Sequence, residues 1–377
     1  MRRFALPLLL AALALPAAAR AALPTAGHTK LIVGQTSISY VDAFAKDTGI
    51  EPAGGMWYTA AYQDPTAVMG EVADAVHTHP GLEVNLGVSL GSVSTPEAPR
   101  TAAIAAGVYD SELAQLAEDI KALPQTTFYV RIGYEFDLLG GQYGPPATYI
   151  AAYQHIVDLF RAAGVHNAVY VWHSAGAFWR ATDQSFLGQL QGDYSVPVPS
   201  YDPQPISAWY PGRDYVDAFG ISYWGDTCCF GRTSQKSRDL YEQRTREILD
   251  QAKGLGLPII ISESTPTYVG NTSKEWVDKA VDLIDSYDIR VWSLIAMNWQ
   301  DLDFYSQSFW NGYWPNASFG GPDAASARAD FLAHTDTQKG CVDDLRLGGA
   351  VAQPVARLEA AGLLALRPRA VEGQFLA

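Results

Sequence analysis

Eight short apolar runs recur along this 377-residue chain, and longer amphipathic stretches separate them. Most of the runs are almost continuously apolar, which is typical of parallel strands that are covered on both faces. The predicted strands span residues 31–35, 55–59, 82–90, 127–136, 168–174, 216–224, 258–264 and 291–299. This alternation constrains the chain to an α/β fold.

Amphipathic helices fit between these strands. Asp64 and Pro65 form a helix start, and Tyr149, Tyr153 and Phe160 lie on one apolar stripe of a later helix. Eight strands that each lead into a helix or loop predict a single (β/α)8 TIM barrel. A doubly wound sheet is the main alternative. It would usually show a glycine-rich phosphate turn after an early strand, and none is present.

The longest predicted loops all follow strands at their carboxyl ends. They span residues 140–147, 178–215, 225–235 and 300–322. Active sites of TIM barrels are built from these carboxyl-end loops. We therefore expect the functional residues at that end of the barrel.

The chain divides into three predicted segments. Residues 1–21 read as a secretory signal peptide, with Arg2 and Arg3 before a short apolar stretch and a small-residue cleavage site at 19–21. Residues 22–340 are expected to form the (β/α)8 barrel, and residues 341–377 a C-terminal tail that is partly ordered at best. An uncleaved anchor is the alternative for the first segment. We expect a secreted or periplasmic protein that is not in the membrane after signal cleavage.

The net charge of the chain excludes some classes of binding partner. The chain has 40 Asp and Glu against 26 Lys and Arg, a formal net charge of −14. Without a basic block to neutralise phosphate, nucleic acid and anionic membranes are not expected as partners. We expect a monomer.

Metal binding and cofactors are not expected either. Cys228, Cys229 and Cys341 have no ligand set around them, and one of the adjacent pair could form a disulfide with Cys341. His77 and His79 resemble a metal pair, but they fall at the end of a predicted helix on the amino-terminal face of the barrel.

The fourth predicted strand carries the first candidate for catalysis. Simple alternation puts Tyr129, Arg131, Gly133 and Glu135 on one face, with Glu135 at the carboxyl end. An arginine inside a barrel needs a negatively charged partner. At the strand end, Glu135 could be catalytic. Alternatively, it could serve only to neutralise the charge of Arg131.

The seventh predicted strand carries the second. Alternation puts Ile259, Ile261 and Glu263 on one face, with Glu263 near the carboxyl end. Strands four and seven lie across the barrel mouth, and two facing carboxylates are the minimum equipment for glycoside hydrolysis. The simpler alternative for each glutamate is a solvated carboxylate at a strand end.

Three segments resemble the clan A glycoside hydrolases, and within them glycoside hydrolase family 26, the β-mannanase family. Residues 131–137, RIGYEFD, are similar to the family's Arg-x-x-His-Glu-x-Asn. Residues 209–223 resemble its Tyr-Pro-Gly stretch before the sixth strand, and residues 261–263 match its nucleophile strand. The chain departs from the family at Tyr134, where the family has His, and at Asp137, where it has Asn.

The resemblance implies a retaining double displacement. Glu135 would be the acid/base, Glu263 the nucleophile, and Tyr223 the residue that orients Glu263. Arg131 could be the cation that serves one of the two glutamates. Further substrate-binding or orienting candidates at strand ends are Tyr134, His173, Trp57, Trp224 and Trp299. Flat indole rings stack on the apolar face of a sugar.

The sequence therefore predicts a secreted glycoside hydrolase that needs no cofactor and cleaves β-glycosidic bonds of a polysaccharide or oligosaccharide, with mannan the first guess. The alternative is a catalytically inactive barrel that binds carbohydrate, which the departures at Tyr134 and Asp137 motivate.

Overall fold

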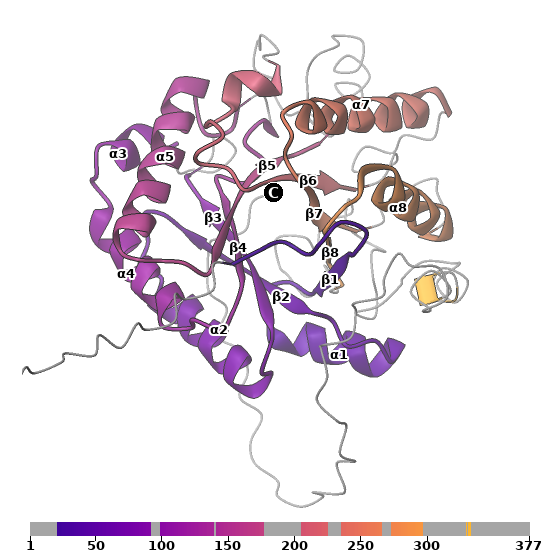
Figure 1. Cartoon of the computed structure of the whole chain (residues 1–377), viewed down its shortest axis with the longest axis horizontal. Coiled ribbons are helices and arrows are strands. Elements are labelled where there is room, and N and C mark those ends of the chain that lie inside the picture. The colour runs from indigo at the N-terminus through magenta and orange to yellow at the C-terminus, as the bar shows by residue number, and fades with distance from the viewer. Residues whose placement is uncertain are drawn as a thin grey trace, which may run out of the picture.

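The computed structural model describes residues 21–91, 99–138, 141–176, 205–224, 235–265, 273–296, 329 and 331–332. Its centre is a closed barrel of eight parallel strands in the order β1 to β8, and β8 pairs with β1. The helices surround the barrel (Figure 1). The predicted single (β/α)8 barrel is confirmed.

Each predicted strand is present, with ends that shift by a few residues. The strand of residues 168–174 has the predicted bounds, whereas the strand that leads to Glu135 is shorter than predicted and ends at Ile132. The strands are β1 (Lys30–Val33), β2 (Gly54–Ala60), β3 (Glu83–Ser89), β4 (Phe128–Ile132), β5 (Ala168–Ser174), β6 (Ala218–Tyr223), β7 (Ile259–Ser264) and β8 (Val291–Leu294).

The helices follow the amphipathic stretches. They are α1 (Ile38–Thr48), α2 (Thr66–Thr78), α3 (Thr101–Ala105), α4 (Asp110–Lys121), α5 (Pro146–Ala162), α7 (Gln235–Gly254), α8 (Ser273–Tyr287) and the 3-10 helix η2 (Ile206–Trp209). Asp64 accepts a hydrogen bond from the Thr66 backbone N–H at 2.9 Å. Asp64 therefore caps α2, although the helix begins at Thr66, after Pro65.

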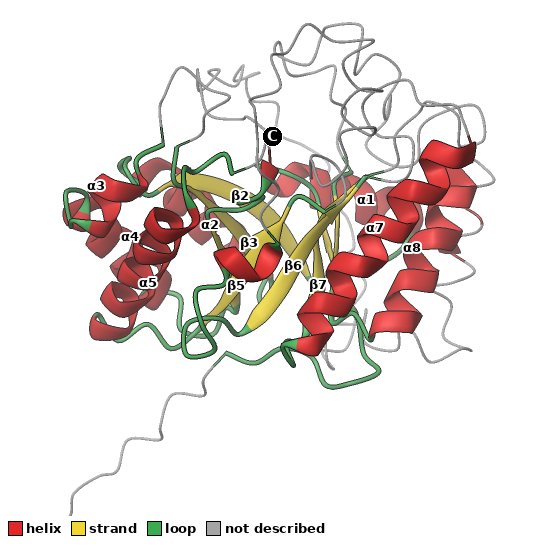
Figure 2. Ribbon diagram, turned by 90° about the horizontal axis from the view of Figure 1, so that it is seen from above, coloured by secondary structure: helices red, strands yellow, loops and turns green. Residues whose placement is uncertain are grey.

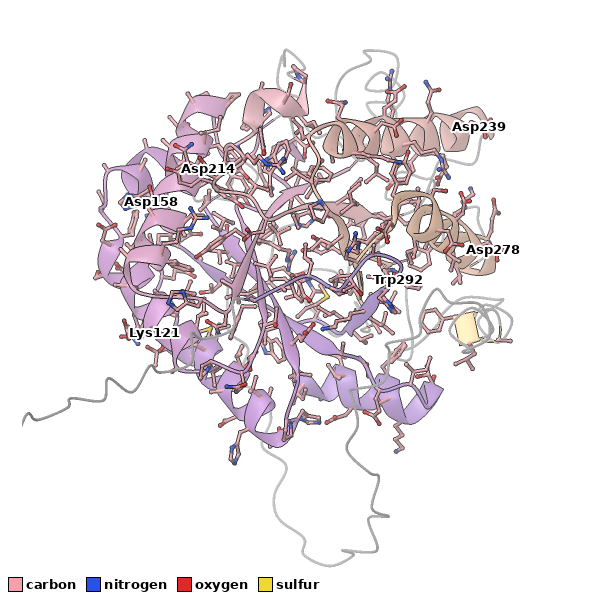
Figure 3. The ribbon with its side chains drawn as sticks, viewed as in Figure 1. Lys121, Asp158, Asp214, Asp239, Asp278 and Trp292 are labelled. Carbon is pink, nitrogen blue, oxygen red and sulfur yellow. The ribbon has the colours of Figure 1, made fainter. Side chains whose placement is uncertain are left out.

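Six of the strands are buried on both faces, toward the helices and toward the barrel interior. Every residue of β2, β4, β5, β6, β7 and β8 is buried, because the helices cover the outside and side chains fill the inside. Figure 2 shows the strands running between the outer helices. Figure 3 labels five exposed charged residues on the periphery, Lys121, Asp158, Asp214, Asp239 and Asp278, whereas the buried Trp292 lies by the barrel.

Polar contacts lie at the amino-terminal end of the barrel. Lys30 pairs with Glu83 at 2.6 Å, and the Tyr129 hydroxyl donates to the same carboxylate at 3.0 Å. His79, just beyond α2, pairs with Asp42 at 2.9 Å. Within the described ranges, no group of three or more His, Cys, Asp or Glu could hold a metal ion.

Several predictions lie outside the described residues: the signal peptide up to residue 20, the tail from 341, all three cysteines and Trp299. The division into three segments therefore remains a prediction. None of the helices in the described part of the chain is long and apolar enough to cross a membrane.

Candidate active site

Glu263 reaches the barrel interior through an irregularity in β7. Ile221 of β6 pairs with Ile261, but the next residue, Ser222, pairs with Glu263, so Ser262 is an extra residue in the register. Ile261 also pairs with Trp292, whose ring packs outward against Trp276 of α8. Ile261 thus faces outward, and the predicted shared face of Ile261 and Glu263 is wrong. The bulge is what turns Glu263 inward.

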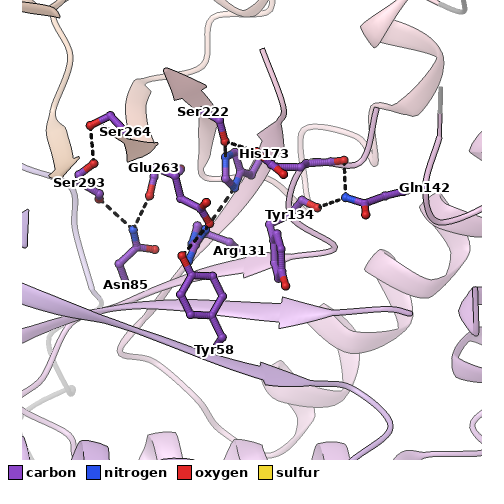
Figure 4. A network of polar contacts seen from close by, with 12 residues as sticks. Tyr58, Asn85, Arg131, Tyr134, Gln142, His173, Ser222, Glu263, Ser264 and Ser293 are labelled. Atoms are coloured by element: carbon purple, nitrogen blue, oxygen red, sulfur yellow. Dashed lines mark hydrogen bonds and ion pairs between the residues drawn. The ribbon is translucent and has the colours of Figure 1, made fainter. Parts of the chain in front are cut away.

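Two side chains hold the Glu263 carboxylate, which is only 3% exposed. Tyr58 of β2 donates its hydroxyl to Oε1 at 2.9 Å, and Arg131 of β4 forms an ion pair with the same oxygen through Nη1. Figure 4 shows Arg131 beside Tyr58, Glu263 and His173. The guanidinium also lies over the Tyr58 ring, 4.8 Å from its centroid. Arg131 therefore serves Glu263, and the idea that Glu135 merely neutralises Arg131 is wrong.

Glu135 reaches the interior by a different irregularity. β4 ends at Ile132, and Gly133 and Glu135 both adopt left-handed backbone conformations, with φ of 56° and 54°. A Cβ on Gly133 would meet Leu90 and Tyr149 of α5, so this position faces outward. Simple alternation therefore fails at Gly133 as it does in β7. Gln142 fixes the turn by donating to the carbonyls of Tyr134 and Glu135 at 3.0 and 2.7 Å.

The surroundings of Glu135 favour a protonated carboxyl group. The side chain is 1% exposed, and Ser222 donates its hydroxyl to Oε1 at 2.6 Å. Burial and the negative charge of Glu263 raise the pKa of Glu135 to about 8; Asp137 adds to the rise, while the Ser222 hydrogen bond and Arg131 oppose it. The two glutamates are thus close enough for the charge of Glu263 to contribute to the raised pKa of Glu135.

His173 lies at the end of β5, fully buried and directed to the interior. Its Nε2 is 2.9 Å from Ser222 Oγ, and its Nδ1 is 3.5 Å from Arg131 Nη1. Burial and the nearby guanidinium hold the pKa of His173 well below its usual range, so the ring is neutral. The predicted candidate is therefore in the polar network around the two glutamates.

Tyr134 packs within the same network. Its ring lies 5.6 Å from the Tyr58 ring and 6.5 Å from the His173 ring, and the Arg131 guanidinium is 5.4 Å from its centroid. Asp137, the other departure from the resembled family, accepts bonds from Ser174 Oγ at 2.7 Å and the Ala175 N–H at 2.8 Å. It ties the turn after β4 to the end of β5.

Two predicted site residues face the wrong way for their predicted roles. The Tyr223 hydroxyl donates to Glu242 of α7 at 2.8 Å, and the ring stacks on Trp276, so Tyr223 points outward and does not orient Glu263. The Trp57 ring lies against Gly55 on the outer face of β2, the face that α1 covers. Alternation along β2 and β6 instead turns their neighbours, Tyr58 and Ser222, to the interior.

Trp224 follows Ser222 by two residues and is buried, with its backbone N–H donated to the Tyr241 hydroxyl. Its contact with a sugar stays a prediction. The residues that sequence reasoning missed are Tyr58, Ser222 and Gln142. Tyr58 and Ser222 could have been found by asking which neighbour of a predicted aromatic has the inward parity, whereas nothing in the sequence marks Gln142.

Comparison with known proteins gives partial matches. No family model matches the sequence. Endoglucanase H of Acetivibrio thermocellus is 29% identical over 139 residues, which is 36% of this chain. The chain spans only 13% of the length of that curated relative.

Solved structures match over most of the chain. GH26C from a Muricauda species has a TM-score of 0.55 at 17% identity, covering 85% of this chain and 89% of that one. The GH26 β-mannanase BoMan26A from Bacteroides ovatus has a TM-score of 0.54 at 11% identity, covering 87% and 95%. XacCel5A, solved with cellopentaose, has a TM-score of 0.51 at 12% identity, covering 80% and 99%. At the level of the fold, the chain is thus similar to GH26 and Cel5A enzymes, as its sequence resemblance led us to expect.

Proposed function

We propose that this protein is a retaining glycoside hydrolase in which Glu135 is the acid/base and Glu263 the nucleophile. The observation that carries the proposal is the contrast between the two carboxyl groups. Glu135 is buried with a pKa raised to about 8, whereas Glu263 has the positive charge of Arg131 against it. Such contrasting environments separate an acid from a nucleophile in this chemistry.

The first step uses this contrast directly. Glu135 donates its proton to the oxygen of the leaving sugar, and Glu263 attacks the anomeric carbon to form a glycosyl ester. Arg131 and the Tyr58 hydroxyl hold Glu263 Oε1, so the carboxylate enters the reaction already oriented.

The second step follows from the charge coupling. Once Glu263 is esterified, its negative charge no longer raises the pKa of Glu135. Glu135, which has just lost its proton, can then act as the base that activates water against the ester. The same pair of side chains thus supports both halves of a double displacement.

The substrate class is a β-linked polysaccharide or oligosaccharide. BoMan26A is described as a β-mannanase and the Acetivibrio relative as an endoglucanase, so β-mannan and β-glucan are the first substrates to test. The signal peptide predicted for residues 1–21 supports the proposal that the enzyme is secreted. The proposal requires no cofactor.

The test is hydrolysis of soluble β-mannan and β-glucan, with the anomer of the first product followed by NMR. The expected result is a β-product from wild type and a loss of at least about 10³-fold in kcat for Glu263→Gln. Exposed Glu51→Gln is the matched control and should retain activity. Inversion would contradict the retaining step, and saccharide binding without turnover in wild type would favour the inactive binding barrel.

A further inference from the structure

Besides its ion pair with Glu263, Arg131 is connected to Glu135 indirectly, through a series of hydrogen bonds. Three contacts join them: a long one from Arg131 Nη1 to His173 Nδ1 at 3.5 Å, and two shorter ones, from His173 Nε2 to Ser222 Oγ at 2.9 Å and from Ser222 Oγ to Glu135 Oε1 at 2.6 Å. All four side chains are buried. The steps come from β4, β5 and β6, so the path crosses three neighbouring strands.

The direction of every hydrogen bond in this path follows from its first member. A guanidinium can only donate, so the His173 Nδ1 that faces it must accept. A neutral ring then carries its proton on Nε2 and donates it to Ser222 Oγ. Ser222 Oγ accepts that hydrogen bond, and its single hydroxyl hydrogen is donated to Glu135 Oε1.

We propose that His173 and Ser222 are positioning residues that pass this directed chain of hydrogen bonds from Arg131 to Glu135, so that Oε1 always accepts and the transferable proton sits on Oε2. Among the described residues, Oε1 is the carboxyl oxygen of Glu135 for which a hydrogen bond is found. The inference rests on the proposed role of Glu135 as the acid/base.

Arg131 Nη1 is the common point of the two carboxyl groups. It has two hydrogens, one of which reaches Glu263 directly and the other His173. One nitrogen thereby orients the nucleophile and, through two buried side chains, the acid. This explains why a neutral histidine, which has no free proton to give at Nδ1, is kept at full burial beside a cation.

Interrupting the series of hydrogen bonds at Ser222 should change the titration of Glu135 alone. The ionisable groups around Glu135 are Glu263 from β7, Arg131 from β4, Asp137 and Tyr143 from the segment after β4, and His173 from β5 through Ser222. Ser222→Ala leaves each of these in place. Because the lost bond favoured the charged carboxylate, the midpoint should rise by about one pH unit.

The readout is the carbon-13 titration of the Glu135 carboxyl in glutamate-labelled protein, with the signal assigned by its absence from Glu135→Gln. Ser222→Thr keeps the hydroxyl and should restore the wild-type midpoint. Ser264→Ala removes another buried strand serine, one that donates to the Ser293 carbonyl at 2.7 Å, and should leave the midpoint unchanged. An unchanged midpoint in Ser222→Ala would overturn the proposal.

A second measurement uses the unaltered protein. Nitrogen-15 shifts of His173 should report a neutral ring with the proton on Nε2, and a proton on Nδ1 would overturn the direction of the chain. Neither readout needs turnover. A shifted midpoint in a protein without hydrolase activity would therefore refute the proposed function but support the proposed series of hydrogen bonds. Hydrolysis with an unshifted midpoint would refute only the series of hydrogen bonds.

Discussion

Glu135 and Glu263 carry the same carboxyl group, but the protein surrounds them differently. Glu263 has a guanidinium and a phenol hydroxyl against one oxygen, whereas Glu135 has one serine hydroxyl and the field of a second carboxylate. At the residue scale, chemistry is therefore assigned by neighbours rather than by residue type.

The first prediction concerns the free energy of unfolding as a function of pH. The pKa of Glu135 in the folded protein, about 8, lies above its usual 4.5. The carboxyl therefore favours folding fully below pH 4.5, and this contribution is lost as pH rises toward about 8. Glu135→Gln cannot ionise, so its stability relative to wild type should increase over this window.

Urea denaturation at several pH values between 5 and 8 measures this difference. Glu51→Gln, at an exposed position, serves as the control and should show the wild-type pH dependence. A constant difference between Glu135→Gln and wild type across the window would show that Glu135 is not held protonated by folding.

The second prediction concerns the hydroxyl of Tyr58. Tyr58→Phe keeps the ring under Arg131 but removes the hydrogen bond to Glu263, so kcat should fall about tenfold or more, with about 1 kcal/mol of stability lost. Tyr129→Phe removes a comparable bond, to Glu83, at the other end of the barrel. It should cost similar stability and leave kcat unchanged. Equal kcat losses in both variants would indicate a structural role only.

At the element scale, both glutamates depend on a break in regular strand geometry. A bulge at Ser262 turns Glu263 inward, and a left-handed turn after β4 does the same for Glu135. Strict alternation in the sequence predicted the correct side for both residues but by the wrong route, since Gly133 and Ile261 face outward. Local sequence does not encode a bulge, because the extra residue is selected by pairing with a distant strand.

The third prediction tests the turn after β4. Gly133→Ala places a methyl group 2.7 Å from both Leu90 Cδ1 and Tyr149 Cε2, at a φ of 56°. Gly164→Ala has a similar backbone, with a φ of 81°, but no atom within 4 Å of the new methyl group. It should lose only the backbone cost of about 1–2 kcal/mol and keep its kcat.

Gly133→Ala should lose more stability than Gly164→Ala, and also kcat, because relieving the clash displaces Glu135. Chemical denaturation and initial rates on the same preparations separate the two effects. A Gly133→Ala enzyme with wild-type kcat would mean that the turn does not position the acid.

At the scale of the whole molecule, the barrel could be predicted from the sequence, but its inner surface could be predicted only in part. Eight apolar runs predict eight strands, because a barrel strand is covered on both faces. The same property conceals which side chains face inward, which is why Trp57 and Tyr223 were expected in the site while Tyr58 and Ser222 occupy it. Solved structures that are 11% and 17% identical to this chain share its fold, so the fold persists although most residues differ.

In the proposed reaction, Glu263 forms a covalent bond to the sugar while Glu135 supplies the proton. The most direct measurement is mass spectrometry of the protein after incubation with a 2-fluoro-mannoside or 2-fluoro-glucoside disaccharide that has a good leaving group. We expect one added glycosyl group, on the peptide that contains Glu263. An active enzyme that labels elsewhere, or that inverts its product without labelling, would contradict it.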